Sequence, residues 1–233
     1  MIARRTLLSR RTLLLGAVAL GAAGCGDQAD PPAPKDAPAA EPPPPPGAGA
    51  DLPVVAILGD SITAGYGLPA RDALPAQLEA ALAAAGTPVR VRAAGVSGDT
   101  TAGALARLDF SIQDDTDLCV VALGGNDLLQ GIEPATMRAN LEAIITRLKA
   151  RNIPVLLAGM QAPPSYGAYA TDFAAVFEGL ARDHDIPLYP FLLDGVALDP
   201  ALNQDDGIHP NAAGVKVIAQ RLAPVVAGAL AEV

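Results

Sequence analysis

The sequence predicts an α/β fold of three layers, α/β/α, in which helices cover both faces of a five-stranded parallel sheet. Two observations lead to this prediction. Short apolar runs alternate with longer amphipathic stretches, and the order strand, helix, strand recurs at intervals of roughly thirty residues. Such repetition is typical of right-handed β-α-β units, which build parallel sheets that are buried on both sides.

The expected strands are the apolar runs Val54–Leu58, Val89–Ala93, Leu118–Leu123, Val155–Gly159 and Pro187–Tyr189. The expected helices are the stretches between and after them, 73–85, 101–109, 135–151, 168–184 and 211–231. Pro75 and Pro134 suit the first turn of a helix, where the missing N–H needs no partner, and Gly86 suits the residue just past a helix end. Cys119 lies within the third apolar run, which predicts a small core residue.

Composition and charge limit the function classes. The chain has 233 residues, of which 51% are hydrophobic and 18% charged, enough for one substantial core. Residues 1–25 contribute four arginines and no acid to a formal net charge of −9, so the remainder carries −13. A body this acidic is repelled by nucleic acid and by anionic membrane surfaces, so neither is an expected partner.

Residues 1–25 have the pattern of an export signal. Basic residues come first, an apolar stretch follows, and small residues lead to Cys25. The segment Ser9–Leu14 resembles a twin-arginine signal, and an ordinary secretory signal with an incidental arginine pair is the alternative. Ala22–Cys25 resembles a bacterial lipobox, which would make Cys25 a lipidated first residue, and a plain cleavage site is the alternative. The expected location is the periplasm or cell envelope of a bacterium, as a lipid-anchored lipoprotein.

Residues 26–52 predict a disordered linker rich in proline and alanine. Pro42–Pro46 is a run of five prolines, which favours polyproline II and cannot build a core. Fully extended, this segment would reach up to roughly 80 Å from the anchor. The folded domain is therefore expected over residues 53–233.

Small and polar residues follow the expected strands. Ser61 comes shortly after the first strand, Gly98 follows the second, and Asn126 follows the third. Asp206 and His209 lie three residues apart in the last loop. Because parallel strands end at one edge of a sheet, where open α/β sheets bind ligands, we expect these residues to converge.

Ser61, His209 and Asp206 match the parts of a catalytic triad. A serine hydroxyl is a poor nucleophile until a base removes its proton, and the base needs a carboxylate to fix its tautomer. The chain has two histidines. His184 falls at the end of an expected helix, where the dipole favours a cation, and is interpreted as structural.

Each residue also has a simpler explanation. Ser61 could cap a helix, and Asp206 could only hold a turn. Gly98 and Asn126 are common in turns of any kind, and His209 alone could be a surface residue. The interpretation as an enzyme depends on these five residues occurring together, in order, at strand ends.

These blocks together resemble the SGNH, or GDSL-type, hydrolase family, named for a serine, a glycine, an asparagine and a histidine. The similarity runs from about Val54 to Ala223 and is strongest to the bacterial thioesterase I/lysophospholipase L1 subgroup, also described as arylesterases. The stretches that carry it are Ser97-Gly98-Asp99-Thr100, Leu105-Ala106-Arg107-Leu108, Leu123-Gly124-Gly125-Asn126-Asp127 and Gln204-Asp205-Asp206-Gly207-Ile208-His209-Pro210-Asn211. Ile62 stands where the family's GDSL motif has leucine, which leaves the nucleophile unchanged.

The resemblance implies a flavodoxin-like fold and an acyl-serine intermediate. The oxyanion would be held by the backbone N–H groups of Ser61 and Gly98 and by the side-chain amide of Asn126. Losing one such donor typically costs ~3–4 kcal/mol of transition-state stabilisation. No cofactor is implied. A metal site built on Asp205, Asp206 and His209 is the alternative, but no second histidine or free cysteine lies nearby in the sequence.

Two apolar loops are expected to line a groove for the acyl chain. Tyr66 and Leu68 follow the nucleophile closely. Pro164 and Tyr166 follow the fourth strand, in a stretch that looks like the subgroup's mobile loop. Ordinary surface loops are the alternative interpretation.

The sequence thus predicts a serine hydrolase that cleaves small carboxylic esters or thioesters, as an arylesterase, acyl thioesterase or lysophospholipase does. Two alternatives remain. The same residues could remove O-acetyl groups from envelope polysaccharide. A tethered binding protein with an inactive site would be a non-enzymatic alternative.

Overall fold

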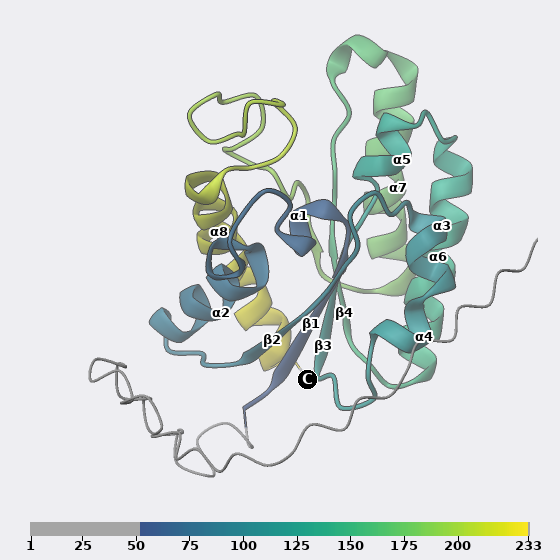
Figure 1. Cartoon of the computed structure of the whole chain (residues 1–233). Coiled ribbons are helices and arrows are strands. Elements are labelled where there is room, and N and C mark those ends of the chain that lie inside the picture. The colour runs from purple at the N-terminus through teal and green to yellow at the C-terminus, as the bar shows by residue number, and fades with distance from the viewer. Residues whose placement is uncertain (1–51, 233) are drawn as a thin grey trace, which may run out of the picture. The chain divides into compact units, whose positions relative to one another are not determined.

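The structure, a computed structural model, describes residues 52–232 (Figure 1). The predicted export signal over 1–25, including Cys25, and the predicted linker up to residue 51 lie outside the described residues. Five strands form one parallel sheet in the order β2-β1-β3-β4-β5. They are β1 (Val54–Gly59), β2 (Arg90–Gly95), β3 (Leu118–Ala122), β4 (Val155–Ala158) and β5 (Leu188–Tyr189).

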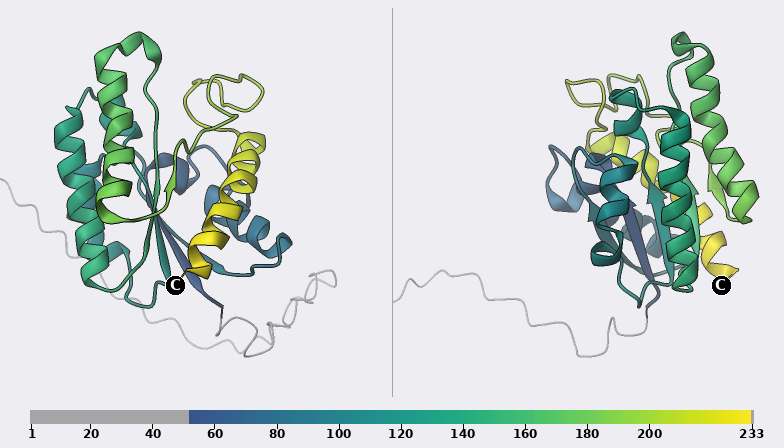
Figure 2. Two further views of the ribbon diagram at one scale, coloured as in Figure 1. Left: turned by 180° about the vertical axis from the view of Figure 1, so that it is seen from behind. Right: turned by 90° about the vertical axis from the view of Figure 1, so that its right-hand side faces the viewer.

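The helices lie on both faces of the sheet, as the views from the front and behind show (Figures 1 and 2). One layer contains α2 (Leu74–Ala84) and α8 (Ala212–Ala231), which pack against each other. The other contains α3 (Thr101–Ala106), α6 (Pro134–Ala150) and α7 (Ala168–His184). The predicted three-layer α/β/α fold is therefore confirmed.

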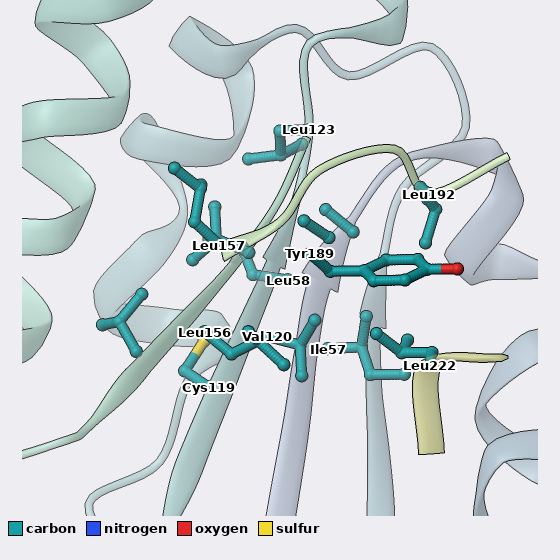
Figure 3. Packing of buried hydrophobic residues seen from close by; sticks show 14 of the residues in the cluster. Ile57, Leu58, Cys119, Val120, Leu123, Leu156, Leu157, Tyr189, Leu192 and Leu222 are labelled. Atoms are coloured by element: carbon teal, nitrogen blue, oxygen red, sulfur yellow. The ribbon is translucent and has the colours of Figure 1, made fainter. Parts of the chain in front are cut away.

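The core is centred on the three middle strands. Every residue of β1, β3 and β4 is buried, because helices cover both faces of these strands. Figure 3 shows Leu156, Val120 and Ile57, which are register partners on neighbouring strands, packed side by side in this layer. Burying an aliphatic side chain of this size contributes about 1.5–3 kcal/mol. Cys119 is wholly buried among them, and burial raises the pKa of its thiol to about 12, so the predicted core role is confirmed.

Helix α8 is long and apolar enough, by length and composition, to cross a membrane. In this fold it instead presents a stripe of side chains to the interior at helical spacing: Val215, Ile218, Leu222 and Val226 are all buried. The helix is therefore a core element of the α/β domain.

The structure corrects the predicted elements in two ways. The helix expected over 101–109 is interrupted at Arg107, where φ is −105° and ψ is 5°, and continues as α4 (Leu108–Ser111). Stretches expected as loops contain short helical turns. These are α1 (Ser61–Ala64), η1 (Ala70–Asp72), α5 (Gly125–Leu129) and η2 (Pro164–Tyr166).

Candidate active site

Ser61 is the first residue of α1, directly above the carboxyl end of β1. Asp60 caps this helix, since its Oδ1 accepts a hydrogen bond from the Ile62 N–H at 3.0 Å. Ser61 therefore does not serve as the cap, which removes the simplest alternative to a chemical role. The turn is tightly packed: a Cβ at Gly59 would lie 2.1 Å from Thr63 Oγ1. No side chain therefore fits at the end of β1, two residues before Ser61.

His209 and Asp206 complete the triad geometry. His209 Nε2 lies 2.9 Å from Ser61 Oγ, and His209 Nδ1 lies 2.6 Å from Asp206 Oδ2. These contacts join residues 148 positions apart in the chain. The expected convergence of the first and last loops is thus present in the structure.

The two carboxylate oxygens of Asp206 make different contacts. Its Oδ1 accepts hydrogen bonds from the backbone N–H groups of Ile208 and His209, each at 2.9 Å, while Oδ2 faces the imidazole. The backbone bond from His209, the ring contact and the bond from Ile208 together lower the pKa of Asp206 to about 2. The residue therefore holds the turn and remains an anion beside the imidazole at neutral pH.

The two expected oxyanion segments lie beside Ser61. Gly98 has a φ of +87°, a left-handed conformation that favours glycine, so its sharp turn is as expected. Asn126 lies in the first turn of α5, and its Nδ2 donates to the Asp99 carbonyl at 2.9 Å. The same Nδ2 lies 3.4 Å from Asp60 Oδ2. Within residues 52–232, the backbone N–H groups of Ser61 and Gly98 have no protein acceptor.

Asp60 is a buried carboxyl group at the floor of the site. Its side chain is almost wholly enclosed, and desolvation raises its pKa to about 6. The hydrogen bond from the Ile62 N–H and the attraction of His209 act in the opposite direction but are weaker. Sequence reasoning assigned no function to this residue.

A pocket of about 570 Å³ opens beside Ser61, His209 and Asn126. Its walls are mainly apolar and come from loops and from the short helices α1 and α5. They include Ile62, Leu128, Leu129, Met160, Phe191, Leu193, Leu198 and Ile208.

Two of the four residues expected to bind substrate line this pocket, namely Tyr66 and Pro164. Leu68 lines a second cavity of about 10 Å³ behind Ser61 and otherwise packs against the core. Its backbone N–H bonds to the Gly65 carbonyl at 3.0 Å, which turns the chain back toward the domain. Tyr166 lies on the surface beside Tyr169, with ring centroids 6.2 Å apart.

Tyr66 and Gln204 contact the catalytic loop in a way that the sequence did not indicate. The ring of Tyr66 lies 4.6 Å from the imidazole of His209, tilted by 34°. Gln204 Nε2 donates to the Tyr66 carbonyl at 2.8 Å and to the Pro210 carbonyl at 3.0 Å. The amide side chain thus joins the loop after β1 to the loop that carries His209.

The remaining candidates lie apart from the site. His184 is the last residue of α7, with Nε2 3.8 Å from Glu142 Oε1, so its predicted place at a helix end is confirmed. Over residues 52–232, no group of three or more histidine, cysteine or acidic side chains is arranged to hold a metal ion.

Comparisons with known proteins agree with this geometry. A family model described as GDSL-like Lipase/Acylhydrolase matches residues 57–217. The chain is 41% identical to esterase TesA of Pseudomonas aeruginosa over 156 residues, covering 66% of this chain and 78% of that protein. It is also 41% identical to thioesterase 1/protease 1/lysophospholipase L1 of Escherichia coli K12 over 157 residues, covering 66% and 74%.

Solved structures show the same relationship. A crystal structure of TesA has a TM-score of 0.71 at 37% identity, covering 76% of this chain and 99% of that chain. AlinE4, an SGNH-hydrolase family esterase, has a TM-score of 0.65 at 46% identity, covering 77% and 97%. The chain belongs to the GDSL-like lipase/acylhydrolase family and is a carboxylic ester and thioester hydrolase.

Proposed function

We propose that Ser61 is the nucleophile of this hydrolase, His209 its general base and Asp206 the carboxylate that orients His209. The observation that carries the proposal is the continuous chain of contacts from Ser61 Oγ through His209 to Asp206, at 2.9 and 2.6 Å. His209 takes the proton of Ser61 as its oxygen attacks the acyl carbon, and then returns a proton to the leaving alcohol or thiol. Water repeats the steps on the acyl-serine.

The oxyanion of each tetrahedral intermediate is held by three donors in this proposal. They are the backbone N–H groups of Ser61 and Gly98 and the Nδ2 amide of Asn126. Two observations support it: all three groups line the same pocket, and the two backbone donors have no acceptor in the described part of the chain. Such donors act most strongly where water is excluded, which the apolar pocket walls favour.

The substrate class proposed is an ester or thioester with a medium-length acyl chain. A volume of about 570 Å³ with mostly apolar walls is far larger than an acetyl group requires. Tyr66 and Pro164 would contact the chain. The pocket therefore favours acyl esters over the alternative of O-acetyl groups on polysaccharide.

The test is a series of ester and thioester substrates from acetyl to long-chain acyl, measured on the wild type and on Ser61→Ala. We expect Ser61→Ala to lose activity by about 10⁴-fold or more. More than a tenth of the activity remaining would overturn the assignment of Ser61. An optimum at acetyl, with poor turnover of longer chains, would favour the polysaccharide alternative.

Export and lipid anchoring are proposed from the sequence alone. Residues 1–25 would direct export, Cys25 would carry the lipid, and residues 26–52 would tether the hydrolase domain over 53–233. Mass spectrometry of the mature N-terminus, with Cys25→Ser as the matched control, tests this. An unmodified Cys25, or cleavage elsewhere, would exclude the anchor.

A further inference from the structure

The side chain of Arg107 bonds to two segments next to the proposed active site, at Gly59 and Asp99, and to Ser111 in α4. Its Nε lies 2.5 Å from Asp99 Oδ2, its Nη2 donates to the Gly59 carbonyl at 3.0 Å, and its Nη1 lies 2.9 Å from Ser111 Oγ. Gly59 is the last residue of β1, two positions before Ser61. Asp99 directly follows Gly98. We infer that Arg107 and Asp99 form a positioning pair that holds the oxyanion donors in place.

The Gly59 carbonyl fixes the turn that contains Gly98 at both ends. At the start of the turn, the Val96 N–H donates to Gly59 O at 3.1 Å. At its end, Asp99 is held by Arg107, which donates to the same carbonyl oxygen. The left-handed Gly98 lies between these two points. The orientation of the Gly98 N–H is therefore fixed relative to the end of β1, which Ser61 follows.

Asp99 transmits this constraint to the third donor. Its carboxylate binds Arg107, while its backbone carbonyl accepts the Asn126 Nδ2 hydrogen bond at 2.9 Å. One residue therefore determines both the end of the Gly98 turn and the orientation of the Asn126 amide. Room for the carboxylate is kept by Gly103, where a Cβ would lie 2.8 Å from Asp99 Oδ1.

The chemistry of the contact requires a guanidinium. Three nitrogens of one rigid plane reach three acceptors on different segments, which a lysine ammonium on a flexible stem cannot reproduce. The side chains of Arg107 and Asp99 are 20% and 17% exposed, so solvent only partly screens the pair. Arg107 lies between α3 and α4, where the helix is interrupted. Arg107 acts through other residues, because none of its contacts involves Ser61, His209 or Asn126 directly.

This inference rests on the proposed oxyanion function of Gly98 and Asn126. Donors displaced by a fraction of an ångström stabilise the transition state less but bind the ground state almost as before. We expect Arg107→Met and Arg107→Lys to lower kcat by about 10- to 100-fold with little change in KM. Affinity for a boronic acid, which forms a tetrahedral adduct with serine, should fall by a similar factor.

Arg92→Met is the matched control. Arg92 lies on the outer strand β2, away from the pocket, and forms an ion pair with Asp115. Replacing Arg92 should leave kcat and boronate affinity unchanged. Thermal unfolding and circular dichroism show whether each variant is folded. Where Arg107→Met does not fold, Asp99→Asn replaces it, since this change removes the charge but keeps the Asp99 carbonyl.

The double variant Arg107→Met with Asn126→Ala distinguishes positioning from a general loss of structure. If Arg107 acts through the donors, its effect on kcat should be markedly smaller once Asn126 is already absent. Fully multiplicative losses, a normal kcat in folded Arg107 variants, or a change confined to KM would each overturn the inference. An active Ser61→Ala variant would instead reject the proposed function itself, whatever the result for Arg107.

Discussion

Asp60 Oδ2 lies 3.4 Å from Asn126 Nδ2, so a buried carboxyl group faces the amide proposed to stabilise the oxyanion. The amide nitrogen has two protons. One is directed at the Asp99 carbonyl at 2.9 Å, and the longer contact to Asp60 takes the other. A developing oxyanion would have to compete only with the longer and weaker of these two contacts. The protonation state of Asp60 therefore bears on both stability and catalysis.

Asp60→Asn should remove a pH dependence of stability. Burial raises the pKa of Asp60 from 3.8 to about 6 in the folded protein. Between these values the unfolded chain has released a proton that the folded chain keeps, so the free energy of unfolding falls as pH rises from about 4 to 6. The free energy of unfolding decreases by about 3 kcal/mol over this range. Asparagine cannot ionise but can still accept the Ile62 N–H bond.

Urea unfolding of both proteins from pH 4 to 8 measures this difference. We expect the variant to gain stability relative to the wild type as pH rises through the window, with the gain levelling off above pH 6. Parallel curves would mean that Asp60 does not hold its proton in the folded state.

Asn126→Ala should lower kcat by about 10²- to 10³-fold and change KM little, because the amide is required only when charge develops on the acyl oxygen. Stopped-flow measurement of the acylation step on a chromogenic ester checks this directly. A raised KM at normal kcat would instead place the amide in ground-state binding.

The long elements of this fold were predictable because their patterns are long. Helix α7 spans 168–184 as expected, and each of the five predicted strands overlaps an observed one. Short helices such as α1 and α5 have too few residues to show a helical period, so Ser61 and Asn126 were expected in loops. The break at Arg107 was hidden because its cause is tertiary: the arginine bonds to Gly59 and Asp99, which lie elsewhere in the sequence.

The convergence of the residues proposed for the triad and the oxyanion site was predictable, because parallel strands bring their carboxyl ends to one edge of the sheet. The pocket wall was not. Leu68 is only two residues from Tyr66, yet the intervening Gly67, with φ of +73°, and the bond to Gly65 turn it away from the pocket. Leu129, Leu198 and Ile208 reach the wall from three separate segments. Such a surface depends on loop packing, which no local pattern encodes.

Asp206→Asn should be severely impaired although the loop stays intact. Asparagine Oδ1 can still accept the two backbone bonds from Ile208 and His209. Its NH₂ group, however, would donate to His209 Nδ1, which forces the ring proton onto Nε2, facing Ser61. That nitrogen can then no longer accept the serine proton. We expect kcat at pH 7 to fall by about 10³- to 10⁴-fold while circular dichroism shows that the variant is folded. A loss below tenfold would refute the orienting function.

Tyr66→Leu should slow acylation modestly, whereas Tyr66→Phe should not. The aromatic ring lies 4.6 Å from the imidazole, which becomes a cation when it takes the Ser61 proton. At a partly exposed position such an interaction is worth about 0.5–1 kcal/mol, or about two- to fivefold in rate. Single-turnover rates at saturating substrate separate this effect from any change in acyl binding. Equal rates for the phenylalanine and leucine variants would contradict it.

Leu198→Asn should raise stability and weaken binding of long acyl chains. Leu198 has a φ of +66°, a left-handed conformation that costs a bulky residue roughly 1–2 kcal/mol, and its side chain is 88% exposed. Because the side chain is exposed, its burial offsets little of this strain. The side chain does line the pocket, where it can contact an acyl chain. Asparagine adopts the same conformation more readily. We therefore expect the free energy of unfolding to rise by about 1 kcal/mol, and KM to increase for long acyl esters but not for acetyl esters. Leu198→Ala is the matched control, because it shortens the side chain and keeps the backbone penalty. A KM that is unchanged in both variants would show that Leu198 makes no contact with the substrate. Acyl binding would then not offset the backbone strain at this residue.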